Sequence, residues 1–143
     1  MRVYDAKACS VSFANIPITG WADGDFVVID NESDAYGDAI GTDGEVTRFR
    51  TNDDRANVTI RLMQSSAVND QLSALHTLDK LSSNGAGLGV FYFKDTNGTS
   101  IYSGENAWIQ KAPPATFSRE VKEREWKIRV AKLVRVDGSN TGT

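Results

Sequence analysis

Short runs in which apolar and polar residues alternate every second position constrain this fold more than any other feature. The clearest runs place apolar side chains at Val58, Ile60 and Leu62, and again at Trp126, Ile128 and Val130. A period of two puts one face of a β-strand in a core and leaves the other face in water. The sequence therefore predicts a β-rich protein built mainly from half-buried strands.

Turn-forming residues divide the chain into several such strands. The expected strands are Ala8–Phe13, Ile16–Ile18, Asp25–Asp30, a segment beginning near Ser33, Val46–Arg50, Val58–Gln64, Leu88–Lys94, Ile101–Tyr102 with Ala107–Gln110, and Glu125–Val134. Four consecutive apolar residues make Phe26–Ile29 the more buried type of strand. A change of phase in the last strand predicts a β-bulge near Val130. Asn97-Gly98 favours a tight hairpin.

One helix is expected at about residues 66–81, with Ser65 or Ser66 as its cap. Val68, Leu72 and Leu75 fall on one face of this helix. Gly85 follows it and suits the left-handed conformation that ends many helices. Many short strands with one helix predict an antiparallel β-sandwich or partly rolled barrel with the helix on one side.

The length of 143 residues fits a single domain, which we place at residues 1–136. Residues 137–143 are polar and are expected to form a disordered tail. Cys9 is the only cysteine, so an intramolecular disulfide is excluded and a reducing compartment is indicated. The sequence shows no signal peptide, and its apolar runs are too short to span a membrane.

The sequence offers no catalytic, cofactor-binding or metal-binding set. His76 is the only histidine and lies beside the apolar helix face, where a structural role is expected. The glycines at Gly85–Gly89 follow a helix, whereas a phosphate loop precedes one. Asp30, Glu32 and Asp34 lack the glycine and glutamate spacing of a calcium loop, although a weak surface cation site stays open. We therefore expect a protein that is not an enzyme.

Charge is distributed unevenly along the chain. Residues 8–47 hold eight acids and no lysine or arginine, whereas residues 111–135 hold eight bases and three acids. These segments form either two solvated faces or two complementary surfaces that meet between copies of the chain. The segment Asp34–Glu45 contains glycines, acids and few apolar residues, so it is expected to be a long loop. Long loops in small domains often serve function.

Several short motifs follow one another along the chain: Trp21–Phe26, Gly41–Val46 with Arg48 and Arg50, Leu62–Ser66, Asn69 to Leu75, Lys94-Asp95 with Gly98, Ala107–Pro113, and Phe117 to Trp126. In this order they resemble the tail tube protein family of contractile-tailed bacteriophages. The resemblance covers about residues 4–133. It implies a virion structural subunit that forms hexameric rings, which stack into a hollow tube inside a contractile sheath. The implied partners are further copies of the chain, the sheath, baseplate and terminator proteins, and double-stranded DNA passing through the lumen.

Two surfaces are the candidate sites under this interpretation. The loop is expected to contact the neighbouring ring through Asp34, Tyr36, Asp38, Asp43 and Glu45. A basic surface at Arg124, Lys127 and Arg129 is expected to face outwards or into a subunit contact, leaving a net negative lumen. Two alternatives remain: the tube protein of a related contractile injection or bacteriocin particle, and a β-sandwich binding module that uses exposed aromatic residues such as Trp21, Tyr102 and Trp108.

Overall fold

The computed structural model describes residues 9–22, 26–83, 85, 87–95, 98–115, 117–119 and 122–138. The strands are β1 Cys9–Phe13, β2 Ile16–Pro17, β3 Val27–Asn31, β4 Tyr36–Ile40, β5 Val46–Arg50, β6 Ala56–Met63, β7 Gly89–Asp95, β8 Ile101–Lys111, β9 Glu123–Val130 and β10 Val134–Val136. The one helix in the described residues is α1, Val68–Leu81.

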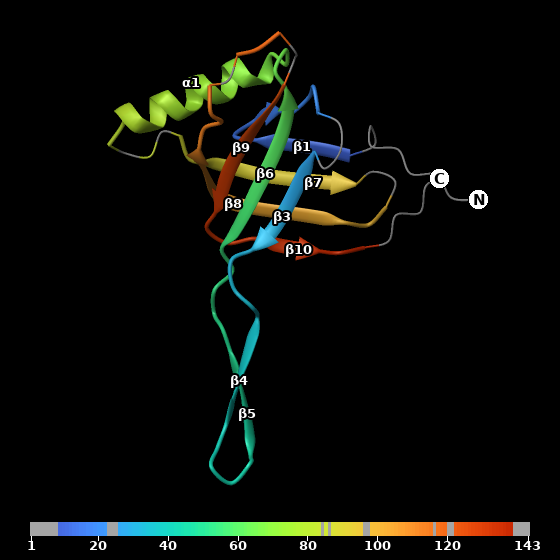
Figure 1. The fold of residues 1–143 in the computed structure, drawn as a ribbon, viewed down its shortest axis with the longest axis vertical. Helices are drawn as coiled ribbons and strands as arrows, with labels where there is room; N and C mark the ends of the chain where they lie inside the picture. The colour runs from blue at the N-terminus through green and yellow to red at the C-terminus, as the bar shows by residue number, and fades with distance from the viewer. Residues whose placement is uncertain are drawn as a thin grey trace, which may run out of the picture.

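Eight strands form one antiparallel sheet that turns back on itself at β8. Its order is β2-β1-β7-β8-β9-β6-β3, with β10 paired to β8. The first part of β8 pairs with β7 and β10, and the end of β8 pairs with β9. The strands β3, β6 and β9 therefore cross the layer of β1, β7, β8 and β10 at a steep angle (Figure 1). This is the expected antiparallel, partly rolled sheet with one flanking helix.

The core lies between these two layers and is closed at one end by α1. Val58, Ile60 and Leu62 are fully buried, as their alternation predicted. Val68 and Leu72 of α1 join the same cluster, while Leu78 at the edge of the helix face is exposed. The indole Nε1 of Trp126 donates a hydrogen bond to Asn69 Oδ1 at 2.9 Å, which ties β9 to the first turn of the helix.

The sequence signals for the turn after β1 and for the end of α1 are confirmed, and the signal for the start of α1 is close. Ala14 and Asn15 both have positive φ at the turn between β1 and β2, and Gly85 has a φ of +74° after α1. The helix begins at Val68, two residues after the predicted start, and its N-cap position, Ala67, makes no side-chain cap. Ser66 still caps it in part, because its Oγ accepts a hydrogen bond from Val68 N at 3.3 Å.

Several predictions about strands were wrong. The strand expected over Glu125–Val134 is two strands, because β9 ends at Val130 and β10 begins at Val134. Register irregularities lie instead in the pairing of β8 with β9, between Ile109 and Lys111, and in the pairing of β7 with β8, between Gly89 and Phe91. The strand at Val27–Asn31 is not of the more buried type, since its side chains alternate and Val28 is 38% exposed.

A further wrong prediction concerns the segment Asp34–Glu45, which is not a long loop. Its first part is the strand β4, which pairs with β5 in a separate two-stranded sheet. The strand expected to begin near Ser33 begins at Tyr36. This hairpin, which we call the arm (residues 36–50), projects from the body at the end opposite α1 (Figure 1).

Some expectations fall on residues outside the described ranges. Asp23, Asp25 and Asn97 are among them, as are residues 139–143 of the proposed tail. Gly98 N does donate a hydrogen bond to Asp95 O at 3.1 Å, which fits a turn between β7 and β8.

Candidate assembly interface

The arm is exposed along its whole length. Every residue from Tyr36 to Arg50 is exposed except Gly37, which is half-buried. Four large apolar side chains are among them: Tyr36 and Phe49 near the root of the arm, and Ile40 and Val46 beside its tip, 74% and 60% exposed. A solvent-exposed apolar group of this kind on a projecting element is typical of a contact surface.

The register gives the arm two different faces. One face carries Tyr36, Asp38, Ile40, Val46, Arg48 and Arg50, which lie directly opposite one another in pairs. On this face the Arg48 guanidinium lies over the Tyr36 ring, 4.5 Å from its centroid. The other face is small except for Phe49, whose ring covers Gly37. A Cβ at Gly37 would lie 2.3 Å from Phe49 Cζ, so the glycine makes room for the ring.

A compact turn at residues 41–45 closes the arm. Gly41 N donates to Glu45 O at 2.8 Å, and Asp43 Oδ1 accepts a hydrogen bond from Glu45 N at 3.1 Å. Gly44 has a φ of +86°, a backbone conformation that residues with a Cβ rarely adopt. The turn therefore presents the carboxylates of Asp43 and Glu45 at the far end of the arm, away from the body.

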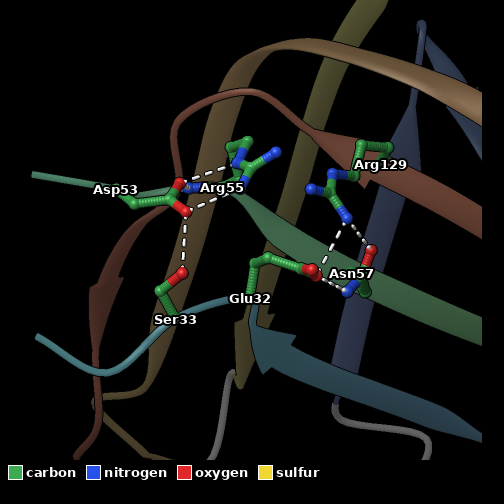
Figure 2. Close-up of polar contacts among 6 residues, drawn as sticks. All are labelled: Glu32, Ser33, Asp53, Arg55, Asn57 and Arg129. Carbon is green, nitrogen blue, oxygen red and sulfur yellow. Dashed lines mark hydrogen bonds and ion pairs between the residues drawn. The ribbon is translucent and has the colours of Figure 1, made fainter. Parts of the chain in front are cut away.

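Two polar clusters hold the root of the arm to the sheet (Figure 2). In the first, Asp53 accepts two hydrogen bonds from the Arg55 guanidinium, both at 2.8 Å, and one from Ser33 Oγ at 2.8 Å. These contacts, those from Arg55 first, hold the pKa of Asp53 well below its usual range. Thr51 N also donates a hydrogen bond to Ala35 O at 2.9 Å, so the two segments that lead into and out of the arm are joined where they leave the body.

The second cluster joins β6 and β9 to the residue that follows β3. Glu32 Oε2 accepts hydrogen bonds from Asn57 Nδ2 at 2.7 Å and from Arg129 at 2.9 Å. Arg129 also donates to Asn57 Oδ1 at 2.8 Å. The hydrogen bond from Asn57 and the charge of Arg129 lower the pKa of Glu32. Arg129, predicted to lie on a free basic surface, is thus neutralised within the chain at the root of the arm.

A basic pocket lies at the other end of the body. It has a volume of about 410 Å³ and is lined by Gln64, Lys111, Ala112, Pro114, Lys122, Glu123, Arg124, Glu125 and Lys127. Two of the three predicted basic residues, Arg124 and Lys127, therefore lie here, and the third does not. Sequence reasoning did not assign Lys111 to this surface, because only the long-range pairing of β8 with β9 brings it opposite Lys127. Lys122 also lines the pocket and lies two residues before Arg124 in the sequence.

The structure gives no chemical role to the histidine, the glycine segment or the acidic residues that the sequence analysis considered. His76 is half-buried on α1, and its buried Nδ1 has no hydrogen-bond partner in the described part of the chain. Gly87 N, in the glycine segment, donates to Asp79 Oδ1 at 3.2 Å after the helix. No group of three or more His, Cys, Asp or Glu residues within the described ranges is placed to hold a metal ion.

The three aromatic residues considered for ligand binding are half-buried. Trp21 packs against the core and against Phe26, with ring centroids 5.1 Å apart. Tyr102 also packs against the core, and its hydroxyl donates to Asp137. Within the residues that the structure describes, no helix is long and apolar enough to cross a membrane.

The rolled antiparallel sheet, its flanking helix and the projecting arm define a β-rich protein with a large exposed apolar surface on one element. The chain matches the family described as Bacteriophage PhiTE tail tube protein over residues 7–138, and it belongs to this family. The resemblance seen in the sequence is confirmed by this match. The chain is therefore a structural component of a phage virion, and not an enzyme.

Relatives agree with this assignment. The chain is 28% identical over 123 residues to "Structural protein ORF10" of Pseudomonas phage KPP10, covering 86% of this chain and 71% of that protein. Its fold is similar to the sheath/tube terminator of the extracellular contractile injection system PVC, with a TM-score of 0.63, 14% identity and coverage of 96% and 99% of the two chains.

Two further solved structures share the fold. The anti-feeding prophage tube terminating cap has a TM-score of 0.59 at 9% identity, with 95% of this chain and 92% of that chain covered. A chain of the PVC sheath-tube complex in the extended state has a TM-score of 0.59 at 12% identity, with 92% and 90% covered. At these identities the likeness supports the fold alone.

Proposed function

We propose that this tail tube protein forms rings, most simply hexamers, that stack head to tail into a hollow tube inside a contractile sheath. Double-stranded DNA passes through the lumen, and baseplate and terminator proteins bind the two ends. Assembly takes place in the cytoplasm of the host bacterium. The observation that carries the proposal is the arm, a projecting hairpin with exposed apolar side chains in a member of a tail tube family.

The energetics of the arm support a contact with a neighbouring ring. A two-stranded hairpin without a third strand or a covering helix is marginally stable in water. Fully burying a side chain such as Ile40 or Phe49 is worth roughly 1.5–3 kcal/mol. An arm that inserts between subunits of the next ring gains this free energy, and Asp34, Tyr36, Asp38, Asp43 and Glu45 are the residues assigned to that contact.

The edges of the eight-stranded sheet support ring formation. Among the described residues, the path of the sheet ends at β2 on one side and at β3 on the other, and β10 forms a further edge beside β8. An edge strand offers backbone groups that can pair with another chain. Because the β2 and β3 edges differ, pairing one to the other between copies gives a head-to-tail contact, which closes when the rotation allows it. A closed ring of this kind covers the β2 and β3 edges.

A tube in a related contractile injection or bacteriocin particle is the second candidate, and the shared fold with the PVC and anti-feeding prophage proteins favours it. Neighbouring genes for capsid and portal proteins would favour a phage tail. Membership in a tail tube family argues against an isolated β-sandwich binding module.

Electron microscopy of the purified protein tests the proposal. We expect negatively stained rings and stacks from the wild-type chain. A variant in which Tyr36–Arg50 is replaced by a short Gly/Ser linker should fold and form rings but should not stack. Replacing the whole hairpin avoids leaving β5 without its partner. The matched control, Leu78→Ser with Leu81→Ser, removes exposed apolar side chains from α1 and should still stack. Full-length tubes from the arm-replaced chain would contradict the assigned contact.

A further inference from the structure

The basic pocket at the helix end carries an uncompensated pair of like charges. Lys111 and Lys127 lie directly opposite each other in the antiparallel pairing of β8 and β9, and both side chains are exposed. Like charges directly opposite each other across two strands are destabilising. No ion pair joins either lysine to a carboxylate in the described ranges. Among the residues that the structure describes, four bases line the pocket against two acids, and one of these acids, Glu125, is paired with Arg61. The pocket therefore keeps an excess of positive charge that a further anionic group can neutralise.

Neighbouring bases on the same face are neutralised, which makes this pair stand out. Arg61 forms an ion pair with Glu125 at 3.2 Å, and Arg129 forms one with Glu32 at 2.9 Å. Lys127 lies between Glu125 and Arg129 on the outer face of β9. Glu125 and Arg129, the charged residues on either side of Lys127, therefore have ion-pair partners within the chain, whereas Lys127 has none in the described ranges.

The arm of the same chain cannot reach this pocket. The arm leaves from the end of the sheet where Asn31 pairs with Ala56, and the pocket lies at the other end, where Met63 pairs with Glu123. At about 3.3 Å per residue, β6 alone separates the two ends by roughly 23 Å. The arm also projects in the opposite direction (Figure 1).

The chemistry of the arm's tip matches the pocket. Asp43 and Glu45 are exposed acids at the turn, with no lysine or arginine between Ile40 and Val46. Ile40 and Val46 flank the turn and are suited to the less polar part of the pocket wall, at Ala112 and Pro114. An acidic tip with an apolar base at one end therefore complements a basic pocket with an apolar wall at the other.

We propose that the Lys111/Lys127 pocket is the receptor for the tip of the arm of a second copy of this chain, and that Asp43 and Glu45 provide the missing countercharge. The proposal rests on the stacking role of the arm given above and assigns its docking site. A contact between opposite ends of identical subunits is heterologous, so it propagates along the tube axis instead of closing into a dimer.

Reciprocal charge reversal tests the assignment. The pocket variant is Lys111→Glu with Lys127→Glu. The tip variant is Asp43→Asn with Glu45→Lys, in which the introduced asparagine keeps a side-chain oxygen to accept the hydrogen bond from the backbone N–H of position 45. Like charges facing each other across an interface cost several kcal/mol, so each variant should raise the concentration needed for stacking at least about tenfold. The chain with both sets of changes should regain stacking.

Controls separate the possible outcomes. Lys94→Glu with Lys132→Glu makes the same charge change on exposed lysines elsewhere and should leave stacking unchanged. Thermal unfolding of each variant shows that it is folded. If the wild-type chain stacks and the pocket variant stacks equally well, or if the combined variant fails to recover, the docking site is wrong while the tube function stands. A pocket variant that stacks normally but no longer retains double-stranded DNA would show that the two lysines contact DNA phosphates and not the arm, which would overturn the assigned docking site.

Discussion

Asp53 links the segment that follows the arm to Ser33 in the segment that precedes it. Its carboxylate accepts hydrogen bonds from Arg55 and Ser33, and its folded-state pKa is depressed below the usual value of about 3.9. A depressed carboxyl pKa adds stability that is present above the unfolded pKa and is lost as the pH falls through the folded pKa. The contribution is therefore complete at neutral pH and is lost progressively below about pH 4.

The variant Asp53→Asn tests this linkage. We expect a lower urea midpoint than wild type at pH 7, and a difference that narrows as the pH is lowered below about 4, where the wild-type carboxyl takes up its proton. Asp54→Asn is the matched control, because Asp54 is the adjacent aspartate and takes part in none of the cluster's three side-chain hydrogen bonds. A difference that stays constant from pH 7 to pH 2 would show that the Asp53 charge does not act through these contacts.

At the scale of the element, the arm depends on the fit of Phe49 over Gly37. Cross-strand pairs contribute roughly 0.2–1 kcal/mol, which is a large fraction of the stability of an isolated hairpin. We expect Phe49→Ala to increase amide hydrogen exchange throughout the arm and to leave the eight-stranded body unchanged. Thr47→Ala, on the same face but away from the glycine, should have little effect. Equal protection in the arm of Phe49→Ala and wild type would contradict this role.

The arm also shows where sequence reasoning reached its limit. The strand Val46–Arg50 was predicted correctly because it is rich in strand-forming residues. Its partner Tyr36–Ile40 was not, because Gly37 and Asp38 disfavour strands and only the pairing with β5 offsets them. The fold class was accessible because the alternation at Val58–Leu62 reports a buried face directly. The pocket was only half predicted, since the opposition of Lys111 and Lys127 depends on a register between strands distant in sequence.

At the scale of the whole molecule, two of the three bases of the predicted basic surface have assigned partners other than DNA. Glu32 neutralises Arg129, and Lys127 is assigned to the arm contact. Under the tube proposal, the net charge of the lumen wall is then set mainly by the acidic residues. Each lysine or arginine that pairs with a phosphate adds salt-dependent affinity for DNA, and a hexameric ring multiplies every lumen residue about sixfold.

We therefore expect a net negative lumen, since DNA must slide through it without being held. Acids repel the phosphate backbone over roughly 8–10 Å at physiological ionic strength, a range that matters in a narrow channel. Assembled wild-type tubes should retain little double-stranded DNA at physiological salt, and lowering the salt should increase retention only slightly. A structure of the assembled tube provides the direct measurement, as a count of Lys and Arg against Asp and Glu on the inner wall of each subunit. A wall with more bases than acids, together with steeply salt-dependent DNA retention, would show that the channel follows DNA by attraction.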